Sequence, residues 1–115
     1  MEFTVEFYET RSGQCPIREF LNSLKADPDD FAVVIAGLAK LRNSQYHRPP
    51  LSKAIGREIF ELRHVGKLNT RVFYFFAKGQ RIVAVHGIRN KPRKIPKRDF
   101  EVALERKEDW LSRCR

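Results

Sequence analysis

The sequence predicts an α+β domain, residues 1–115, in which helices pack on one face of a twisted, mostly antiparallel sheet. Segments with period-two alternation of apolar residues and segments with helical spacing follow each other in the order β-α-α-β-β-β-α. Short connections between the later strands favour an antiparallel meander. Because 42% of the 115 residues are hydrophobic, the chain has material for a single core.

The N-terminal half predicts a strand followed by a helical hairpin. Met1–Thr10 alternates apolar and polar residues, as a half-buried strand does. A helix is expected over residues 16–25, where apolar residues make one stripe. Asp27 suits the N-cap and Pro28 the first position of a second helix, which we expect over residues 28–43.

The second half predicts three strands and a last helix, separated by basic loops. A loop is expected over residues 43–56, which contain a Pro-Pro pair. The strands are expected at Glu58–Arg63, Thr70–Phe76 and Arg81–Arg89. Residues 89–98 form a second basic loop, and Pro96 opens the last helix. We expect the basic strands to line the sheet face that the helices leave exposed.

Positive charge is concentrated in the middle of the chain. The net charge is +9, and residues 40–98 hold sixteen basic side chains but only two acidic ones, Glu58 and Glu61. Such a block attracts polyanions over long range. No run approaches the roughly 20 apolar residues that span a membrane, and the N-terminus does not resemble a signal peptide. The two cysteines show no metal-ligand spacing, so we expect reduced thiols in a cytoplasmic protein without a membrane partner.

The signatures of cofactor-dependent and metal-dependent chemistry are missing from the sequence. There is no glycine-rich phosphate loop, no metal-ligand spacing and no nucleophile elbow, so we expect neither metal nor cofactor. A metal nuclease needs several converging carboxylates, and the basic block holds too few. Cations with a tyrosine and a histidine suit metal-free RNA cleavage, in which the 2′-hydroxyl of the substrate attacks the adjacent phosphate.

The candidate site residues lie on the predicted strands and in the loop after them. Arg63 and Arg71 are expected to meet across neighbouring antiparallel strands and to bind phosphate, or else to balance Glu61 at the surface. Tyr74 is either core packing or a base-stacking or acid–base residue, and His86 is either structural or catalytic. Lys91 and Lys94 lie in the Pro-flanked loop. The cations expected to bind RNA are Lys53, Arg57, Lys67, Arg89, Arg93, Lys97 and Arg98.

Five segments together resemble the phage-derived, HigB-like branch of the RelE/ParE toxin superfamily. They are G-x-C-P-I-x-E-F-L at 13–21, L-x-x-L at 38–41, F-E-L-R at 60–63, T-R-V-F-Y-F-F at 70–76 and H-G-I-x-N-K-x-x-K-I-P at 86–96. Where the family usually carries paired lysines after the H-G pair, this chain has Asn90-Lys91.

The resemblance implies a RelE-like fold, and a toxin that cleaves mRNA on the ribosome and is neutralised by a cognate antitoxin, often a helix-turn-helix protein. It implies functional roles for six residues, which are Arg63, Arg71, Tyr74, His86, Lys91 and Lys94. Two other functions stay open at this point. One is a ParE-like toxin that inhibits DNA gyrase without cutting RNA, and the other is a nucleic-acid-binding module without catalysis.

Overall fold

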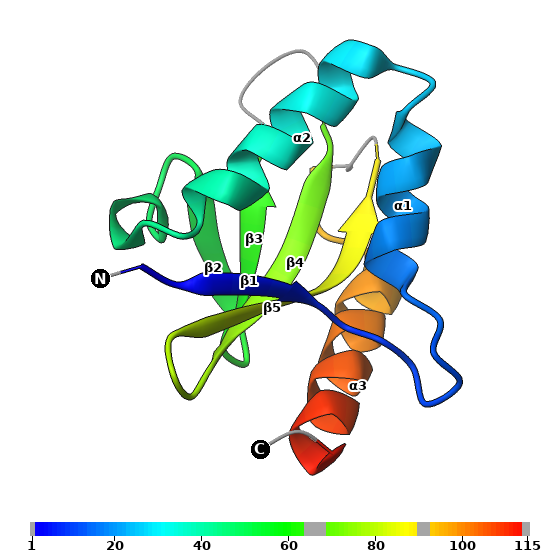
Figure 1. Cartoon of the computed structure of the whole chain (residues 1–115), viewed down its shortest axis with the longest axis vertical. Coiled ribbons are helices and arrows are strands. Elements are labelled where there is room, and N and C mark those ends of the chain that lie inside the picture. The colour runs from blue at the N-terminus through cyan, green and yellow to red at the C-terminus, as the bar shows by residue number, and fades with distance from the viewer. Residues whose placement is uncertain (1, 64–68, 90–92, 114–115) are drawn as a thin grey trace.

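A computed structural model describes residues 2–63, 69–89 and 93–113 and confirms the α+β fold (Figure 1). Its elements are β1 (Thr4–Phe7), α1 (Pro16–Leu24), α2 (Pro28–Lys40), the short 3₁₀ helix η1 (Ser44–Tyr46), β2 (Ser52–Gly56), β3 (Ile59–Arg63), β4 (Arg71–Ala77), β5 (Arg81–Ile88) and α3 (Lys97–Arg113). The strands form one sheet in the order β1-β5-β4-β3-β2. Only the β1–β5 pair is parallel among these strands, so the sheet is mostly antiparallel.

The start of α2 is fixed by side chains, as the sequence predicts. The Asp27 carboxylate accepts a hydrogen bond from the Asp30 backbone N–H at 3.3 Å, and Pro28 occupies the first turn. Asp30 is itself buried and accepts a hydrogen bond of 3.0 Å from the Thr70 hydroxyl, next to the start of β4. The helix is thereby held to the sheet at the end where β4 begins.

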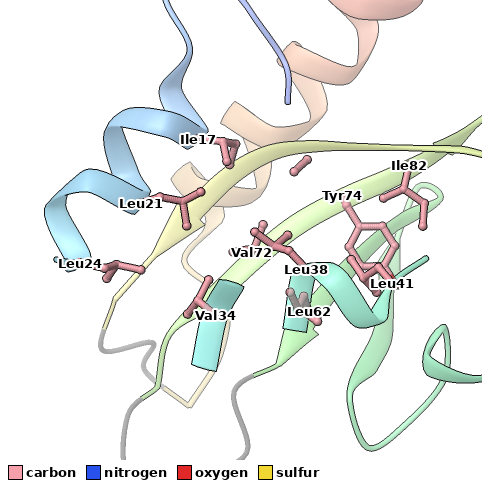
Figure 2. Packing of buried hydrophobic residues seen from close by; sticks show 11 residues of the cluster. Ile17, Leu21, Leu24, Val34, Leu38, Leu41, Leu62, Val72, Tyr74 and Ile82 are labelled. Atoms are coloured by element: carbon pink, nitrogen blue, oxygen red, sulfur yellow. The ribbon is translucent and has the colours of Figure 1, made fainter. Parts of the chain in front are cut away.

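One face of the sheet packs against α1 and α2. Ile17, Leu21 and Leu24 of α1 join Val34 and Leu38 of α2 in a single buried cluster (Figure 2). The sheet side of this cluster consists of Leu62, Val72, Tyr74, Ile82 and Ala84. Helix periodicity on one side and strand alternation on the other therefore build this layer.

The other face of the sheet packs against α3, so the prediction that all helices lie on one face is wrong. Ala103 and Trp110 of α3 pack on a second buried cluster from alternate strand positions, which are Ile59, Phe73, Phe75, Val83 and Val85. These strand residues are apolar, as those facing α1 and α2 are, because both faces of β4 and β5 are covered. The continuous apolar run over residues 72–76 is typical of a strand that is covered on both faces.

Residues 52–56 form an edge strand, where the sequence predicts a loop. The segment Ser-Lys-Ala-Ile-Gly has little apolar alternation, since it pairs on one side only, with β3. Ser52 is buried and its hydroxyl accepts a hydrogen bond of 2.7 Å from the Tyr74 hydroxyl. This bond and the β3 pairing hold the strand in place despite its polar sequence.

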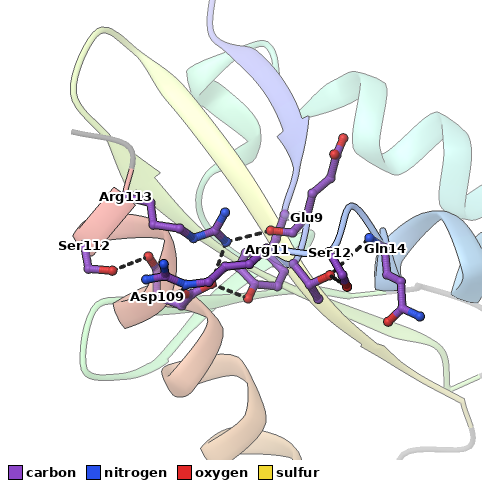
Figure 3. Close-up of polar contacts among 9 residues, drawn as sticks. Glu9, Arg11, Ser12, Gln14, Asp109, Ser112 and Arg113 are labelled. Carbon is purple, nitrogen blue, oxygen red and sulfur yellow. Dashed lines mark hydrogen bonds and ion pairs between the residues drawn. The ribbon is translucent and has the colours of Figure 1, made fainter.

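The N-terminal segment is tied to α3 by polar contacts (Figure 3). The Tyr8 hydroxyl donates to the Asp109 carboxylate at 2.6 Å, and Arg113 donates to the Glu9 backbone carbonyl at 2.7 Å. The Arg11 guanidinium lies 3.6 Å from the same Asp109 carboxylate. The segment after β1 and the last turns of α3 are thus joined around one carboxylate.

Gly87 permits a close approach of α1 to β5, and its replacement is predicted to destabilise the fold. A Cβ atom at this position would lie 2.4–2.7 Å from ring carbons of Phe20. Overpacking of this kind costs about 1–3 kcal/mol. We expect Gly87→Ala to lower the free energy of unfolding in urea denaturation by about that amount. The double variant Phe20→Ala/Gly87→Ala should show a positive coupling, whereas strictly additive losses would contradict the clash.

Candidate nucleic-acid interface

The interface is built on the face of the sheet that carries α3, at the end where β3 finishes and β4 begins. The strand register pairs Arg63 directly with Arg71, and pairs Glu61 with Phe73 on one side and Lys53 on the other. Residues directly opposite in neighbouring strands point to the same face of a sheet. Three cations and one carboxylate from three strands therefore lie on the same face of the sheet. They are Lys53, Arg63, Arg71 and Glu61.

Glu61 is the centre of this group. It is fully buried, with 0% of its surface exposed. Its Oε1 atom accepts a hydrogen bond from Arg71 Nε at 3.2 Å and lies 3.7 Å from Arg63 Nε. A carboxylate between two guanidinium groups offsets their mutual repulsion, which lets two arginines lie side by side on neighbouring strands. The predicted meeting of Arg63 and Arg71 is therefore confirmed in position.

The two arginines differ in their access to solvent. The Arg71 side chain is 9% exposed, and its Nη1 atom donates to the Thr70 carbonyl at 3.1 Å. The bonds from Nε to Glu61 and from Nη1 to Thr70 use two of the five N–H groups of Arg71 within the described part of the chain. The Arg63 side chain is 38% exposed. Arg63 is therefore the more accessible of the two guanidinium groups.

Tyr74 lies on the opposite face of the sheet from the arginines, so the structure supports the core-packing alternative and not a role beside them. Three positions separate it from Arg71, and odd spacings along a strand point to opposite faces. Its ring is fully buried against α1 and α2, and its hydroxyl donates to Ser52. Burial raises the pKa of Tyr74, and the Ser52 hydrogen bond opposes this only in part. The side chain is core packing with a satisfied hydroxyl.

His86 faces α3 because of a β-bulge. The β4–β5 register runs from Phe73–His86 to Tyr74–Ala84, so Val85 is the extra residue. As a result Val85 and His86, which are adjacent in sequence, both face α3. Strict alternation would have placed His86 against α1.

Both ring nitrogens of His86 are engaged by α3. Nε2 lies 2.7 Å from the Asp99 carboxylate, and Nδ1 lies 3.2 Å from Arg106 Nη1. Because a guanidinium only donates, Nδ1 is the acceptor and Nε2 carries the proton. A catalytic role for His86 has no support in this geometry, since both nitrogens are in contact with side chains of α3. The side chain joins β5 to α3.

The pKa of His86 is lowered from its ordinary value of 6.5. Burial is the main cause, because it penalises the charged imidazolium. The hydrogen bond to Asp99 raises the pKa and the nearby Arg106 charge lowers it, so the two α3 partners act in opposite directions. His86 is therefore neutral near pH 7.

The other predicted cations fall into three groups. Arg89 follows β5 directly beyond the arginine pair, and it is exposed. Arg93, Lys94, Lys97 and Arg98 are also exposed, before and within the first turn of α3. Arg57 lies in the β2–β3 turn, at the far end of β3 from Arg63, so the structure does not bring it to this surface. Lys67 and Lys91 lie outside the described residues.

Sequence reasoning missed the partners of His86 and the pairing of Lys53 with Glu61. Asp99 and Arg106 are seven residues apart on α3, and this spacing places them on one helix face. This spacing predicts that the two side chains share a helix face, but it does not identify His86 as their partner. Lys53 was expected in a loop, where no register could have placed it opposite Glu61.

A family model described as "Phage derived protein Gp49-like (DUF891)" matches residues 19–108. The chain belongs to this Gp49-like family. The family is a RelE/ParE-like toxin family of toxin–antitoxin systems, which makes the chain a toxin-like protein and points to an antitoxin partner. A comparison with curated proteins found no match.

The described residues of this Gp49-like protein contain neither a membrane-spanning helix nor a metal-binding cluster. None of the described helices combines the length and hydropathy needed to cross a membrane. Residues 2–63, 69–89 and 93–113 contain no group of three or more His, Cys, Asp or Glu side chains placed to hold a metal ion. Cys15 is a buried free thiol, and Cys114 lies outside the described residues.

The different burial of the two arginines predicts different effects on stability. Arg71→Ala removes the buried partner of Glu61, and breaking a buried pair costs about 3–5 kcal/mol. Arg63→Ala removes a partly exposed partner at 3.7 Å, and exposed pairs contribute about 0–1 kcal/mol. We expect urea denaturation to rank the variants in that order. Equal losses would contradict the assignment of Arg71 as the main partner of Glu61.

The lowered pKa of His86 predicts a loss of stability on acidification. A group whose pKa is lower in the folded state contributes stability that is complete above its unfolded pKa of about 6.5 and is lost as the pH falls toward the folded value. We expect the free energy of unfolding of the wild type to fall more steeply between pH 7 and pH 5 than that of His86→Gln, which does not titrate. Parallel pH profiles would show that His86 is not the titrating group.

Proposed function

We propose that this Gp49-like protein is a HigB-like toxin that cleaves mRNA during translation, as a metal-independent endoribonuclease. The observation that carries the proposal is the partly exposed Arg63 held beside the buried Glu61–Arg71 pair. Rigid cations aimed at a phosphodiester suit a reaction in which negative charge develops on phosphate oxygens. Exposed cations at the same end of the sheet supply further attraction for the RNA backbone.

The proposed reaction uses a nucleophile that belongs to the substrate. The 2′-oxygen forms a bond to the adjacent phosphorus, the bond from phosphorus to the 5′-oxygen of the next nucleotide breaks, and a 2′,3′-cyclic phosphate results. The proton of the 2′-hydroxyl goes to a base, and the leaving 5′-oxygen takes a proton from an acid. Arg63 stabilises the charge on the phosphate, with Nη2 of Arg71 as a second donor. DNA lacks the 2′-hydroxyl and is not cleaved.

Proton transfer in this proposal belongs to the loop lysines. Tyr74 is buried on the other face, and His86 has both nitrogens engaged. Lys94 is exposed just before α3, and Lys91, which lies outside the described residues, precedes it by three positions. A lysine ammonium can donate a proton to the leaving oxygen, and the amine can accept one. The remaining partners in the proposal are the ribosome in the cytoplasm and a helix-turn-helix antitoxin.

Removing the charge of Arg63 is predicted to abolish toxicity without unfolding the protein. We expect Arg63→Gln to lower the rate of mRNA cleavage by roughly 10²–10³-fold, the loss typical of one donor to a developing charge. Arg57→Gln is the matched control, because Arg57 is also exposed but lies at the other end of β3. Growth arrest on expression and cleavage in translation extracts would be measured for both variants. Full toxicity of Arg63→Gln would remove Arg63 from the site.

Primer extension on cellular mRNA tests the reaction itself. Cuts within translated codons after induction of the wild type would support the endoribonuclease. Intact mRNA together with broken chromosomal DNA would instead indicate a gyrase inhibitor of the ParE type. Expression without growth arrest, and with RNA bound but uncut, would indicate a binding module.

A further inference from the structure

A cavity of about 630 Å³ lies beside α2, near the end of the sheet where Arg63 and Thr70 lie. It lies between α2, the segment from η1 to β2, and the ends of β3 and β4 that meet near Arg63 and Thr70. Val33 and Gly37 of α2 form one wall, and Tyr46, Pro50 and Leu51 form the other. None of these residues belongs to the arginine site, although Arg63 is among the lining residues.

The walls of this groove are unusually apolar for exposed surface. Val33 is 45% exposed, and it is the most exposed of three exposed large hydrophobic residues among the described residues. Next to it along the groove are Ala36, Gly37 and Leu62. Gly37 lets Leu62 approach α2 closely, since a Cβ there would lie 3.4 Å from a Leu62 methyl carbon. Exposed apolar surface concentrated in one hollow marks a place where another molecule binds.

The charged residues among the described residues that line the groove are all positive. They are Lys40, Arg48 and Arg63, and no described Asp or Glu lines it. The Lys40 ammonium lies 5.7 Å above the Tyr46 ring, which keeps this cation at the mouth of the groove. Apolar walls with a cationic rim match a segment that carries apolar and acidic side chains together.

Two other occupants fit these features less well. A second copy of the chain would bring together two molecules with a net charge of +9 each, which repel each other. Single-stranded RNA would satisfy the cations, but it binds chiefly by stacking bases on exposed aromatic faces. The groove offers aliphatic walls, and the face of its Tyr46 ring is already in contact with Lys40.

We propose that this groove binds an acidic, amphipathic segment of the antitoxin, with apolar side chains against Val33 and carboxylates at Lys40 and Arg48. The inference rests on the proposed function in that it takes the protein to be a toxin with such a partner. Arg63 contributes to both the groove and the arginine site. A segment that fills the groove therefore ends beside the residue proposed to bind the phosphodiester, and it neutralises the toxin there.

The test compares two exposed residues of the same helix. Val33 lines the groove, and Ile35, which is 40% exposed on α2, is not among its lining residues. Val33→Asp and Ile35→Asp add the same charge to the same helix, and valine and aspartate have similar helix propensities. The probe is the purified product of the reading frame adjacent to the toxin gene, and its affinity for the full-length variants is measured by calorimetry.

We expect Val33→Asp to weaken binding by about 30-fold or more, as removal of a central apolar contact does. Ile35→Asp should bind within about threefold of the wild type. In cells, Val33→Asp should remain toxic and escape neutralisation. Reversal of the rim charges in Lys40→Glu/Arg48→Glu should also weaken binding, while circular dichroism shows that each variant is folded.

Several outcomes would overturn the inference. Equal affinity of Val33→Asp and Ile35→Asp would place the antitoxin elsewhere, and so would a wild-type chain that does not bind the probe. Val33→Asp that is neutralised normally but no longer cleaves RNA would make the groove an RNA subsite. Because the main readout is affinity, absence of mRNA cleavage by the wild type would refute the proposed function while leaving the groove result intact.

Discussion

The buried Glu61 carboxylate is the interaction on which the arginine site depends. A fully buried charge is unfavourable unless it is paired, so Glu61 requires Arg71 beside it, and Arg71 accepts burial for the same reason. Once this pair is fixed, Arg63 has a neighbour that limits its freedom while leaving its outer part in solvent. A surface arginine without a partner would lose more conformational entropy on binding a phosphate than Arg63, whose Nε already lies 3.7 Å from the Glu61 carboxylate.

A similar arrangement, in which a buried side chain with polar partners lies near exposed cations, occurs at the start of α3. His86 is neutral and committed to Asp99 and Arg106, so it fixes the first turns of α3 against β5. The exposed cations of that region, Lys94 just before α3 and Arg98 in its first turn, then lie at the start of a helix with a defined position. The residues with polar partners inside the molecule are structural, and the charged residues beside them are available to ligands.

Much of the fold follows from short-range patterns in the sequence, whereas the site depends on pairings that such patterns do not contain. Asp27 and Pro28 mark the start of α2 by local chemistry, and the structure places it there. Period two along β4 separates Tyr74 from Arg71, so the sequence already favours the core-packing alternative for Tyr74. For His86 the obstacle was different, because a bulge at Val85 reverses the alternation and no local signal marks it. The edge strand that begins at Ser52 has little apolar alternation, so the sequence pattern does not indicate a strand there. It is held by pairing with β3 and by a hydrogen bond from Tyr74, which is distant in sequence.

The parallel pairing of β1 with β5 has a consequence for synthesis of the protein. Thr4 pairs with Arg81 and Phe7 with Ala84, so the first strand finds its place only after nearly the whole sheet has been made. Contacts between segments so distant along the chain slow folding, because a long loop must close first. In a nascent chain the first strand therefore stays without its partner strand until residues 81–88 have been made and can pair with it.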